Sequence, residues 1–179
     1  MASVALCFCF LLLSLAAPYY HAYKRWYQLQ IHYYSKKEET VVDDYPKCYP
    51  LLKHNPDFLF EYARCLIRAE RPQEAIPLLE RARELNGDPI ILDTEGYCLQ
   101  VAGRYEEAER LLIQSTARLP ERIHPYFRLV KLYAEPDFYQ PSKLLESADT
   151  LLKKEPKVFN PIVTGFREEV KQLLIEKHL

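Results

Sequence analysis

The chain has 179 residues, a hydrophobic content of 49%, 24 basic and 25 acidic side chains, and a formal net charge of −1. This length suits one helical domain and an additional segment. The near-zero charge argues against a nucleic-acid-binding surface, which needs a strong basic excess. Five cysteines without a C-x-x-C pair argue against a zinc site, and unpaired cysteines are typical of a reducing compartment.

An uncharged apolar run opens the chain. "ASVALCFCFLLLSLAAPYY" occupies residues 2–20, and a helix of this length would extend roughly 28 Å, about the thickness of a bilayer core. Aromatic and basic residues then cluster as at a membrane interface: Tyr19, Tyr20, Tyr23, Lys24, Arg25 and Trp26. We therefore expect residues 1–22 to form a single span of an inner membrane. A cleaved signal peptide and a buried segment are the alternatives, although no basic residue precedes Lys24 as a signal peptide normally requires.

The basic residues around this run predict its orientation. Lys24, Arg25, Lys36 and Lys37 follow the run closely, and nothing basic precedes it. The positive-inside rule then places the rest of the chain in the cytoplasm. If the uncharged start acts as an export signal instead, the rest of the chain would be periplasmic.

A motif recurs along the remaining chain. "WYQLQIHY", "LFEYARCL", "LDTEGYCL" and "YFRLVKLY" begin at residues 26, 59, 92 and 126, which are 33, 33 and 34 residues apart. Small residues recur as well, because Ala75 in "RPQEAIPLLERA" and Ala108 in "GRYEEAERLL" are 33 residues apart. A small residue on the buried side of a helix indicates that another helix lies too close for a larger one. Repeats of this period are typical of helical solenoids.

These residues resemble the tetratricopeptide (TPR) signature, W-x2-L-G-x2-Y followed by A-x3-F and P. Trp26, Leu29 and Tyr33 match the first helix, Gly96 supplies its small residue, and Pro120 matches the closing proline. The resemblance implies an all-α, TPR-like α-solenoid of about four helix pairs over residues 23–157. We expect repeats at residues 23–55, 56–88, 89–122 and 123–155.

Several positions depart from the signature, most of them in the two outer repeats. Gln30 and Val130 replace the small residue, Val42 and Ser142 replace the alanine, and Glu95 occupies an aliphatic position. Terminal repeats are usually atypical because each has only one neighbour. Prolines mark the predicted helix starts: Pro56, Pro72, Pro89 and Pro125.

The last segment, residues 158–179, is predicted to be a capping helix. Asn160 can serve as its N-cap, with Pro161 in the first helical position. An apolar stripe follows at helical spacing: Val163, Phe166, Val170, Leu173 and Leu174. We expect this stripe to cover the exposed end of the fourth repeat.

No catalytic, metal or cofactor site is evident in the sequence. The histidines at 21, 32, 54, 124 and 178 are scattered, and neither H-E-x-x-H nor G-x-S-x-G occurs. Cys65 and Cys98 occupy the same position in successive repeats, too far apart for a disulfide. We therefore expect the cysteines to be small buried hydrophobic residues, and the chain itself not to be an enzyme.

The first helices of TPR repeats line a concave groove. The repeat register places the following residues in this groove: Tyr27, Ile31, Phe60, Arg64, Arg68, Asp93, Tyr97, Phe127 and Lys131. Arg64, Tyr97 and Lys131 occupy equivalent positions in three consecutive repeats. Such a row could hold an extended acidic peptide or a C-terminal carboxylate. The alternative is that these are ordinary residues of an amphipathic surface.

The order of elements resembles one family more closely. An apolar helix runs into "WYQLQIHYY", and "LPERIHPYFRLVKLY" and "KKEPKVFNP" follow the repeats. This is similar to the C-terminal tail of O-antigen ligase/polymerase-family membrane proteins of some Gram-negative bacteria. The resemblance implies a non-catalytic interaction module in cell-surface glycan assembly, because the family's catalytic membrane portion is absent here. The alternative is an independent membrane-anchored or exported TPR adaptor unrelated to glycan chemistry.

Overall fold

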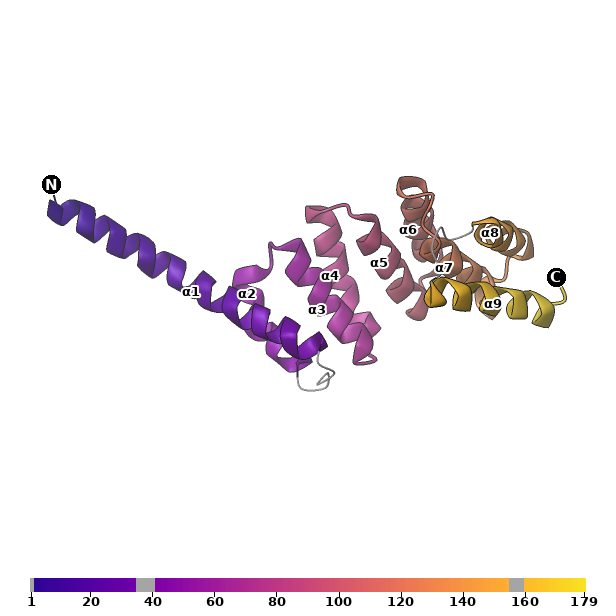
Figure 1. Ribbon diagram of the computed structural model, residues 1–179, viewed down its shortest axis with the longest axis horizontal. Coiled ribbons are helices and arrows are strands. Elements are labelled where there is room, and N and C mark those ends of the chain that lie inside the picture. Colours follow the sequence, from indigo (N-terminus) through magenta and orange to yellow (C-terminus); the bar gives the residue numbers. More distant parts are fainter. Residues whose placement is uncertain (1, 35–40, 155–159) are drawn as a thin grey trace. The chain divides into compact units, whose positions relative to one another are not determined.

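The computed structural model describes residues 2–34, 41–154 and 160–179 (Figure 1). The side chains of residues 2–5, 8 and 32–34 lie outside this description, as do Lys36 and Lys37 of the predicted topology signal. Helices and turns account for the secondary structure of these ranges, with no strand among the described residues. Two compact units make up the chain, Met1–Asn86 and Gly87–Leu179.

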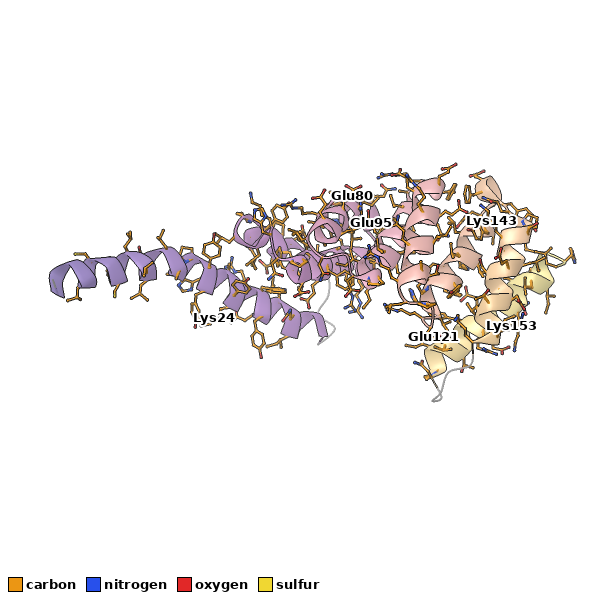
Figure 2. All side chains as sticks on the ribbon, turned by 90° about the horizontal axis from the view of Figure 1, so that it is seen from above. Lys24, Glu80, Glu95, Glu121, Lys143 and Lys153 are labelled. Carbon is orange, nitrogen blue, oxygen red and sulfur yellow. The ribbon has the colours of Figure 1, made fainter. Side chains whose placement is uncertain are left out.

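The first unit opens with one long helix. α1 covers Ala2–Tyr34 without a break, although Pro18 lies inside it. The predicted boundary between a segment 1–22 and a first repeat from residue 23 is therefore not a break in the helix. Its first half extends away from the other helices of the unit (Figures 1 and 2), and Leu6 and Phe10 there are 72% and 76% exposed. In the part of the chain described, no helix meets the length and apolarity needed to cross a membrane.

The second half of the expected first repeat is not a regular helix. A 3-10 helix, η2 (Val42–Lys47), is followed by the four-residue α2 (Tyr49–Leu52). Pro46 and Pro50 explain the difference, because proline lacks the N–H that an α-helix interior needs. A regular pair follows, α3 (Pro56–Arg68) and α4 (Pro72–Leu85). The expectation of a full helix pair in the first repeat is thus wrong over residues 42–52.

The second unit contains two helix pairs and a final helix. α5 (Pro89–Val101) packs on α6 (Tyr105–Arg118), and α7 (His124–Tyr133) packs on α8 (Pro141–Lys153). A short 3-10 helix, η3 (Pro136–Phe138), lies between α7 and α8. The predicted final helix is α9 (Pro161–Glu176), and it contacts both α7 and α8.

The helix starts were predicted correctly, and side-chain caps explain three of them. Asn55 Oδ1 accepts a hydrogen bond from Phe58 N, and Asp88 Oδ1 accepts one from Ile90 N. Asn160 Oδ1 accepts one from Ile162 N. A proline follows each cap, at the first helical position where its missing N–H costs nothing. The same local chemistry therefore starts α3, α5 and α9.

Small residues allow the paired helices to approach closely, as the repeat predicted. Ala75 of α4 and Ala108 of α6 are completely buried. A Cβ atom added to Gly96 of α5 would lie 2.8 Å from Cγ of Leu112 on α6 and 3.4 Å from the carbonyl oxygen of Ala108. Leu112 is itself completely buried and has little room to move.

We expect Gly96→Leu to lower the free energy of unfolding by about 1–3 kcal/mol, because it overpacks the α5–α6 contact. Gly165→Leu is the matched control, since no atom lies within 4 Å of the Cβ position there. Chemical denaturation of both variants measures the difference. Equal stabilities would show that α6 does not confine Gly96.

The connections after α3 and α5 use the same backbone turn. Glu70 and Gly103 hold equivalent repeat positions, with φ angles of 59° and 75°. The next residue in each case returns a hydrogen bond to the helix, from Arg71 N to Leu66 O at 2.8 Å and from Arg104 N to Leu99 O at 2.9 Å. This left-handed helix end favours glycine. Glu70 is therefore strained where its counterpart is not.

Glu70→Gly should raise the free energy of unfolding by about 1 kcal/mol, because it relieves the left-handed strain on a side chain. Gly103→Ala should lower it by a similar amount, about 1 kcal/mol, since it introduces the same strain. Thermal and urea unfolding of the two variants check this reciprocal pair. The idea fails if both substitutions shift stability in the same direction.

The cysteines follow two patterns. Cys48, Cys65 and Cys98 are buried, which confirms the prediction for these three, whereas Cys7 and Cys9 are exposed on the first half of α1. The prediction is wrong for the last two because no other helix of the unit covers that part of α1. Burial raises the pKa of the Cys98 thiol to about 12. All five are free thiols.

Candidate functional site

Five of the residues predicted to line the groove lie in the first unit. Tyr27 of α1 is 64% exposed, and neighbouring Ile31 is exposed as well. On α3, Phe60 and Arg64 are half-buried one turn apart, with the guanidinium carbon of Arg64 at 5.8 Å from the Phe60 ring centroid. Arg68 is exposed at the end of the same helix. The first unit thus presents aromatic and cationic side chains to solvent, and their contact with a partner stays a prediction.

A carboxylate fixes α1 beside α3. Glu61 Oε2 accepts hydrogen bonds from Trp26 Nε1 at 2.9 Å and from Gln30 Nε2 at 2.6 Å. The Trp26 ring meets Phe58 edge-on, with 5.7 Å between the ring centroids. Gln30, which departs from the repeat signature, therefore has a structural use. These polar contacts hold α1, which carries Tyr27, beside α3, which carries Phe60.

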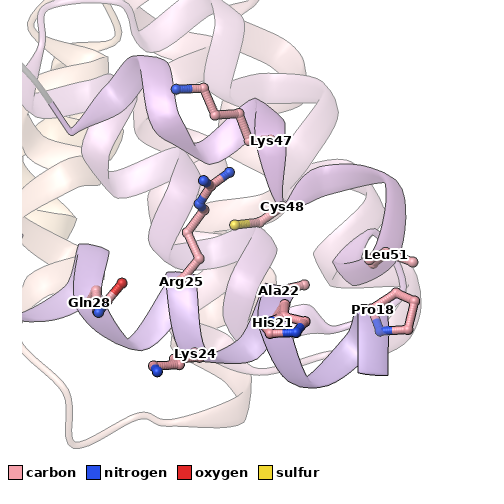
Figure 3. Close-up of a pocket in the computed structure, with 9 residues that line it drawn as sticks. All are labelled: Pro18, His21, Ala22, Lys24, Arg25, Gln28, Lys47, Cys48 and Leu51. Atoms are coloured by element: carbon pink, nitrogen blue, oxygen red, sulfur yellow. The ribbon is translucent and has the colours of Figure 1, made fainter. Parts of the chain in front are cut away.

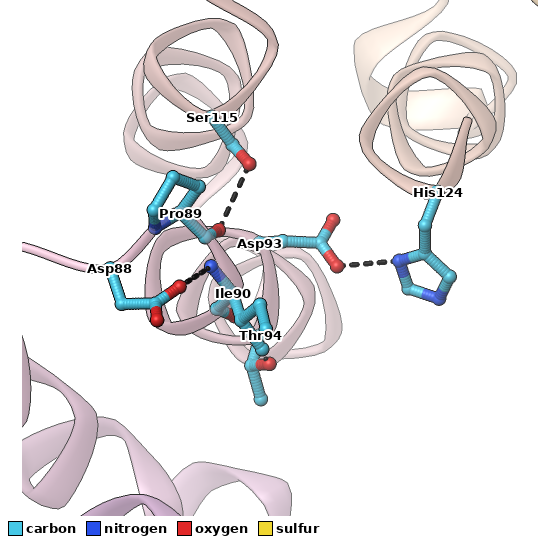
Figure 4. Close-up of polar contacts among 7 residues, drawn as sticks. All are labelled: Asp88, Pro89, Ile90, Asp93, Thr94, Ser115 and His124. Atoms are coloured by element: carbon cyan, nitrogen blue, oxygen red, sulfur yellow. Dashed lines mark hydrogen bonds and ion pairs between the residues drawn. The ribbon is translucent and has the colours of Figure 1, made fainter. Parts of the chain in front are cut away.

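In the second unit, Asp93 is buried rather than open to a groove. Only 3% of the residue is exposed, and its Oδ2 lies 2.5 Å from Nδ1 of His124 on α7 (Figure 4). Figure 4 also shows Ser115 of α6 donating to the carbonyl oxygen of Pro89 at 2.9 Å, beside the cap made by Asp88. The expectation that Asp93 faces solvent is wrong, because α7 brings a histidine onto it.

Tyr97 is also covered from α7. The guanidinium carbon of Arg128 lies 4.0 Å from the Tyr97 ring centroid. Burial lowers the pKa of the Arg128 guanidinium, although the nearby charge of Asp93 opposes this shift. Three buried side-chain atoms lack a hydrogen-bond partner among the described residues: Gln100 Oε1, Arg128 Nε and Asp93 Oδ1. Arg128 and Asp93 both lie at the contact between α7 and α5. Buried polar groups are usually paired, so these two call for an explanation.

The remaining two predicted residues contact α9. Phe127 is 6% exposed and stacks on Phe166, with 4.2 Å between the ring centroids. Lys131 Nζ forms an ion pair with Glu169 Oε1 at 2.8 Å. The final helix therefore covers more than the end of the last repeat, since it also lies on residues predicted to line an open groove. This packing is explained by Phe166 and Glu169 of α9, because Phe127 and Lys131 of α7 provide a contact for each.

We name the surface formed by His124, Phe127, Arg128 and Lys131 the α7 face. Phe127 and Lys131 were predicted from the repeat register, whereas His124 and Arg128 were not. Phe166 was expected to cover the end of the fourth repeat, and no contact was predicted for Glu169. The repeat register could have indicated a role for Arg128. It occupies the same position as Glu61 two repeats earlier, and each of these side chains reaches the preceding first helix of its own unit.

No group of three or more His, Cys, Asp or Glu side chains suited to a metal ion occurs among the residues described. The α7 face instead consists of an aromatic ring, a histidine and two cations, and the predicted residues Tyr27, Phe60, Arg64 and Arg68 of the first unit are likewise aromatic or cationic. This composition is suited to contact with a peptide or protein surface.

Comparison with known proteins identifies the fold. No family model and no curated protein matches the chain, so the resemblance to O-antigen ligase tails finds no support there. Among solved structures, the chain is similar to YrrB, described as a TPR protein with an unusual peptide-binding site. The TM-score is 0.71 and the identity 21%, over 93% of this chain and 78% of YrrB.

A second similar structure is the MamA RS-1 ArsTM double mutant, with a TM-score of 0.70 and 15% identity over 88% of this chain and 85% of MamA. At these identities, the two similar structures show the fold of this chain. The chain has a TPR-like all-α fold, as its repeat spacing predicts.

Proposed function

We propose that the chain is a non-catalytic protein-interaction module and that its α7 face binds an amphipathic, acidic helix. One observation carries the proposal: α9 already lies on this face as such a helix. Phe166 and Glu169 are one turn apart on α9, and they contact Phe127 and Lys131, one turn apart on α7. The α7 face therefore binds a helix that carries an aromatic ring and a carboxylate one turn apart.

The contact resembles the recognition mode in which an apolar helix face enters a groove with anchors at i, i+3 and i+4. The stacked pair excludes water at the centre, and the charged pair lies at the rim, since Lys131 and Glu169 side chains are 41% and 49% exposed. An exposed ion pair contributes little affinity and more specificity. Phe166 is therefore the energetic anchor, and Glu169 selects an acid.

α9 leaves part of the face unused. Arg128 Nε and Asp93 Oδ1 have no hydrogen-bond partner among the described residues. A ligand that offers a polar side chain or a backbone group at this point would recover the cost of burying them, about 1–3 kcal/mol for each group. This supports a partner that competes with α9 and makes contacts that α9 does not.

The first unit supplies a second surface of similar chemistry. We propose that Tyr27, Phe60, Arg64 and Arg68 contact an acidic peptide or a C-terminal carboxylate, as the repeat register suggests. The peptide-binding site of the similar TPR protein YrrB supports this use of the fold. The cations supply charge, and the aromatic rings supply contact area.

A labelled peptide with the sequence of residues 160–179 tests the α7 face by fluorescence anisotropy. In wild type, the chain's own α9 should compete with it. Phe166→Ala combined with Glu169→Gln should weaken α9 and increase affinity for the peptide at least about tenfold, since the competent fraction rises. Lys131→Glu added to that variant should weaken peptide binding about threefold to fivefold, because the exposed ion pair is replaced by a contact of like charges. A peptide carrying Glu169→Lys should restore it by charge exchange.

Arg110→Glu is the matched control, because Arg110 lies on α6 with its side chain 71% exposed. It should leave peptide affinity unchanged. Circular dichroism checks that each variant keeps its helices. The proposal is overturned if the weakened variant does not bind the peptide, or if the exchanged charges do not restore binding.

The membrane and glycan context rests on the sequence resemblance alone. We propose it as the setting in which the module works, with an independent membrane-anchored or exported adaptor as the alternative. The genomic DNA immediately upstream of the Met1 codon distinguishes the two. An in-frame stretch that encodes many membrane helices supports the first, and a ribosome site after a stop codon supports the second.

We further propose that the repeats lie in the cytoplasm, supported by Lys24 and Arg25 after the apolar run. A cysteine introduced at exposed Glu106, with Cys7 and Cys9 replaced, reports on this, because Cys48, Cys65 and Cys98 are buried. A membrane-impermeant maleimide should label it only after cells are lysed. Labelling of intact cells would place the repeats on the outer side.

A further inference from the structure

A basic hollow lies in the first unit between α1 and the segment that contains η2 and α2 (Figure 3). Its volume is about 640 Å³, far more than the roughly 30 Å³ of one water molecule. The charged and polar side chains that line it include His21, Lys24, Arg25, Gln28 and Lys47. No carboxylate lines it among the described residues, so the hollow is suited to an anion.

The arrangement of the basic groups leaves one guanidinium available. Figure 3 shows Arg25 extending from α1 toward Lys47 and Cys48. Lys47 pairs with Asp44 in η2, whereas no carboxylate of the described residues forms an ion pair with Lys24 or Arg25. Ala22 and Cys48, both small and buried, leave space beneath the guanidinium. Arginine matches phosphate oxygens with two parallel hydrogen bonds, and lysine adds a point charge.

The hollow begins where the apolar part of α1 ends. Leu6, Phe10 and Leu13 are 72%, 76% and 69% exposed, and no other helix of the unit covers them. Tyr19 and Tyr20 follow, also exposed, and Lys24 marks the next turn of the helix in Figure 2. In membrane-bound helices, apolar side chains lie in the lipid interior, aromatic rings lie at the interface, and basic groups lie at the level of the headgroups. The side chains along α1 follow this order.

We propose that this hollow binds the phosphate of an anionic phospholipid headgroup, with Arg25 as its main ligand and Lys24 and Lys47 as supporting charges. The exposed apolar side chains of α1 enter the outer part of the bilayer, which holds the hollow at the depth of the phosphates. This contact does not require α1 to cross the membrane. It is also independent of the α7 face, which belongs to the other unit.

Vesicle flotation of the full chain tests the proposal. Vesicles of phosphatidylcholine alone measure the apolar contact of α1, and vesicles with phosphatidylglycerol add the anionic headgroup. The ratio of the two partition coefficients isolates headgroup binding. Arg25→Gln and Lys47→Gln should each lower this ratio about fivefold, as expected for a basic residue at an anionic surface. Lys53→Gln is the matched control, because Lys53 is exposed in the same unit and does not line the hollow.

Inorganic phosphate, titrated by calorimetry at constant ionic strength, separates a lipid from a free anion. Weak phosphate binding together with a lowered vesicle ratio in the two hollow variants supports the headgroup. Tight phosphate binding that also releases the chain from anionic vesicles would assign the hollow to a soluble phosphate compound and overturn the lipid source. An equal loss in Lys53→Gln, or no loss in Arg25→Gln, would overturn the site itself.

Discussion

The close approach of paired helices is the constraint on which the rest of the structure depends. At Gly96, even a methyl group would lie 2.8 Å from Leu112, and Ala75 and Ala108 have no exposed surface. A short helix pair of this kind buries too little apolar surface to be stable alone. Tight pairing fixes the rotation of each first helix about its own axis. That rotation determines which side chains contact a neighbouring helix and which stay exposed for contact with a partner protein.

In α3 and α7, the third residue of the repeat motif links the helix to the preceding first helix of its own unit. Glu61 uses this position to accept two hydrogen bonds from α1, and Arg128 uses it to cover Tyr97 of α5. The two residues have opposite charge at equivalent places in the repeat. The equivalent position therefore carries different polar chemistry in the two units. This explains how one repeat can present an open cationic face in the first unit and an acid-accepting face in the second.

Local features of the sequence predicted the local features of the structure. The prolines with their Asn or Asp caps specify helix starts by hydrogen bonds within a few residues, so one sequence suffices to predict them. Pro46 and Pro50 are equally local features, and they indicate that the second half of the first repeat is not a regular helix. The repeat pattern alone did not predict this. The failures concern contacts between distant segments. The apolar stripe of α9 indicates that the helix is buried, but periodicity does not say against which surface. The pairing of Asp93 with His124 is also a contact between distant segments, because it depends on the packing of α5 against α7.

The candidate site shows why such contacts matter for function. A tethered helix on the α7 face makes the face available only in the fraction of molecules in which α9 has moved away. A partner's apparent dissociation constant is its intrinsic value divided by that fraction. A partner that merely copies Phe166 and Glu169 therefore binds weakly, because it replaces contacts that already exist. A partner that also satisfies Asp93 Oδ1 and Arg128 Nε gains free energy that α9 does not supply. In the proposed mechanism, these two atoms at the α5–α7 contact discriminate between α9 and a partner, and selectivity of this kind is a difference between two affinities.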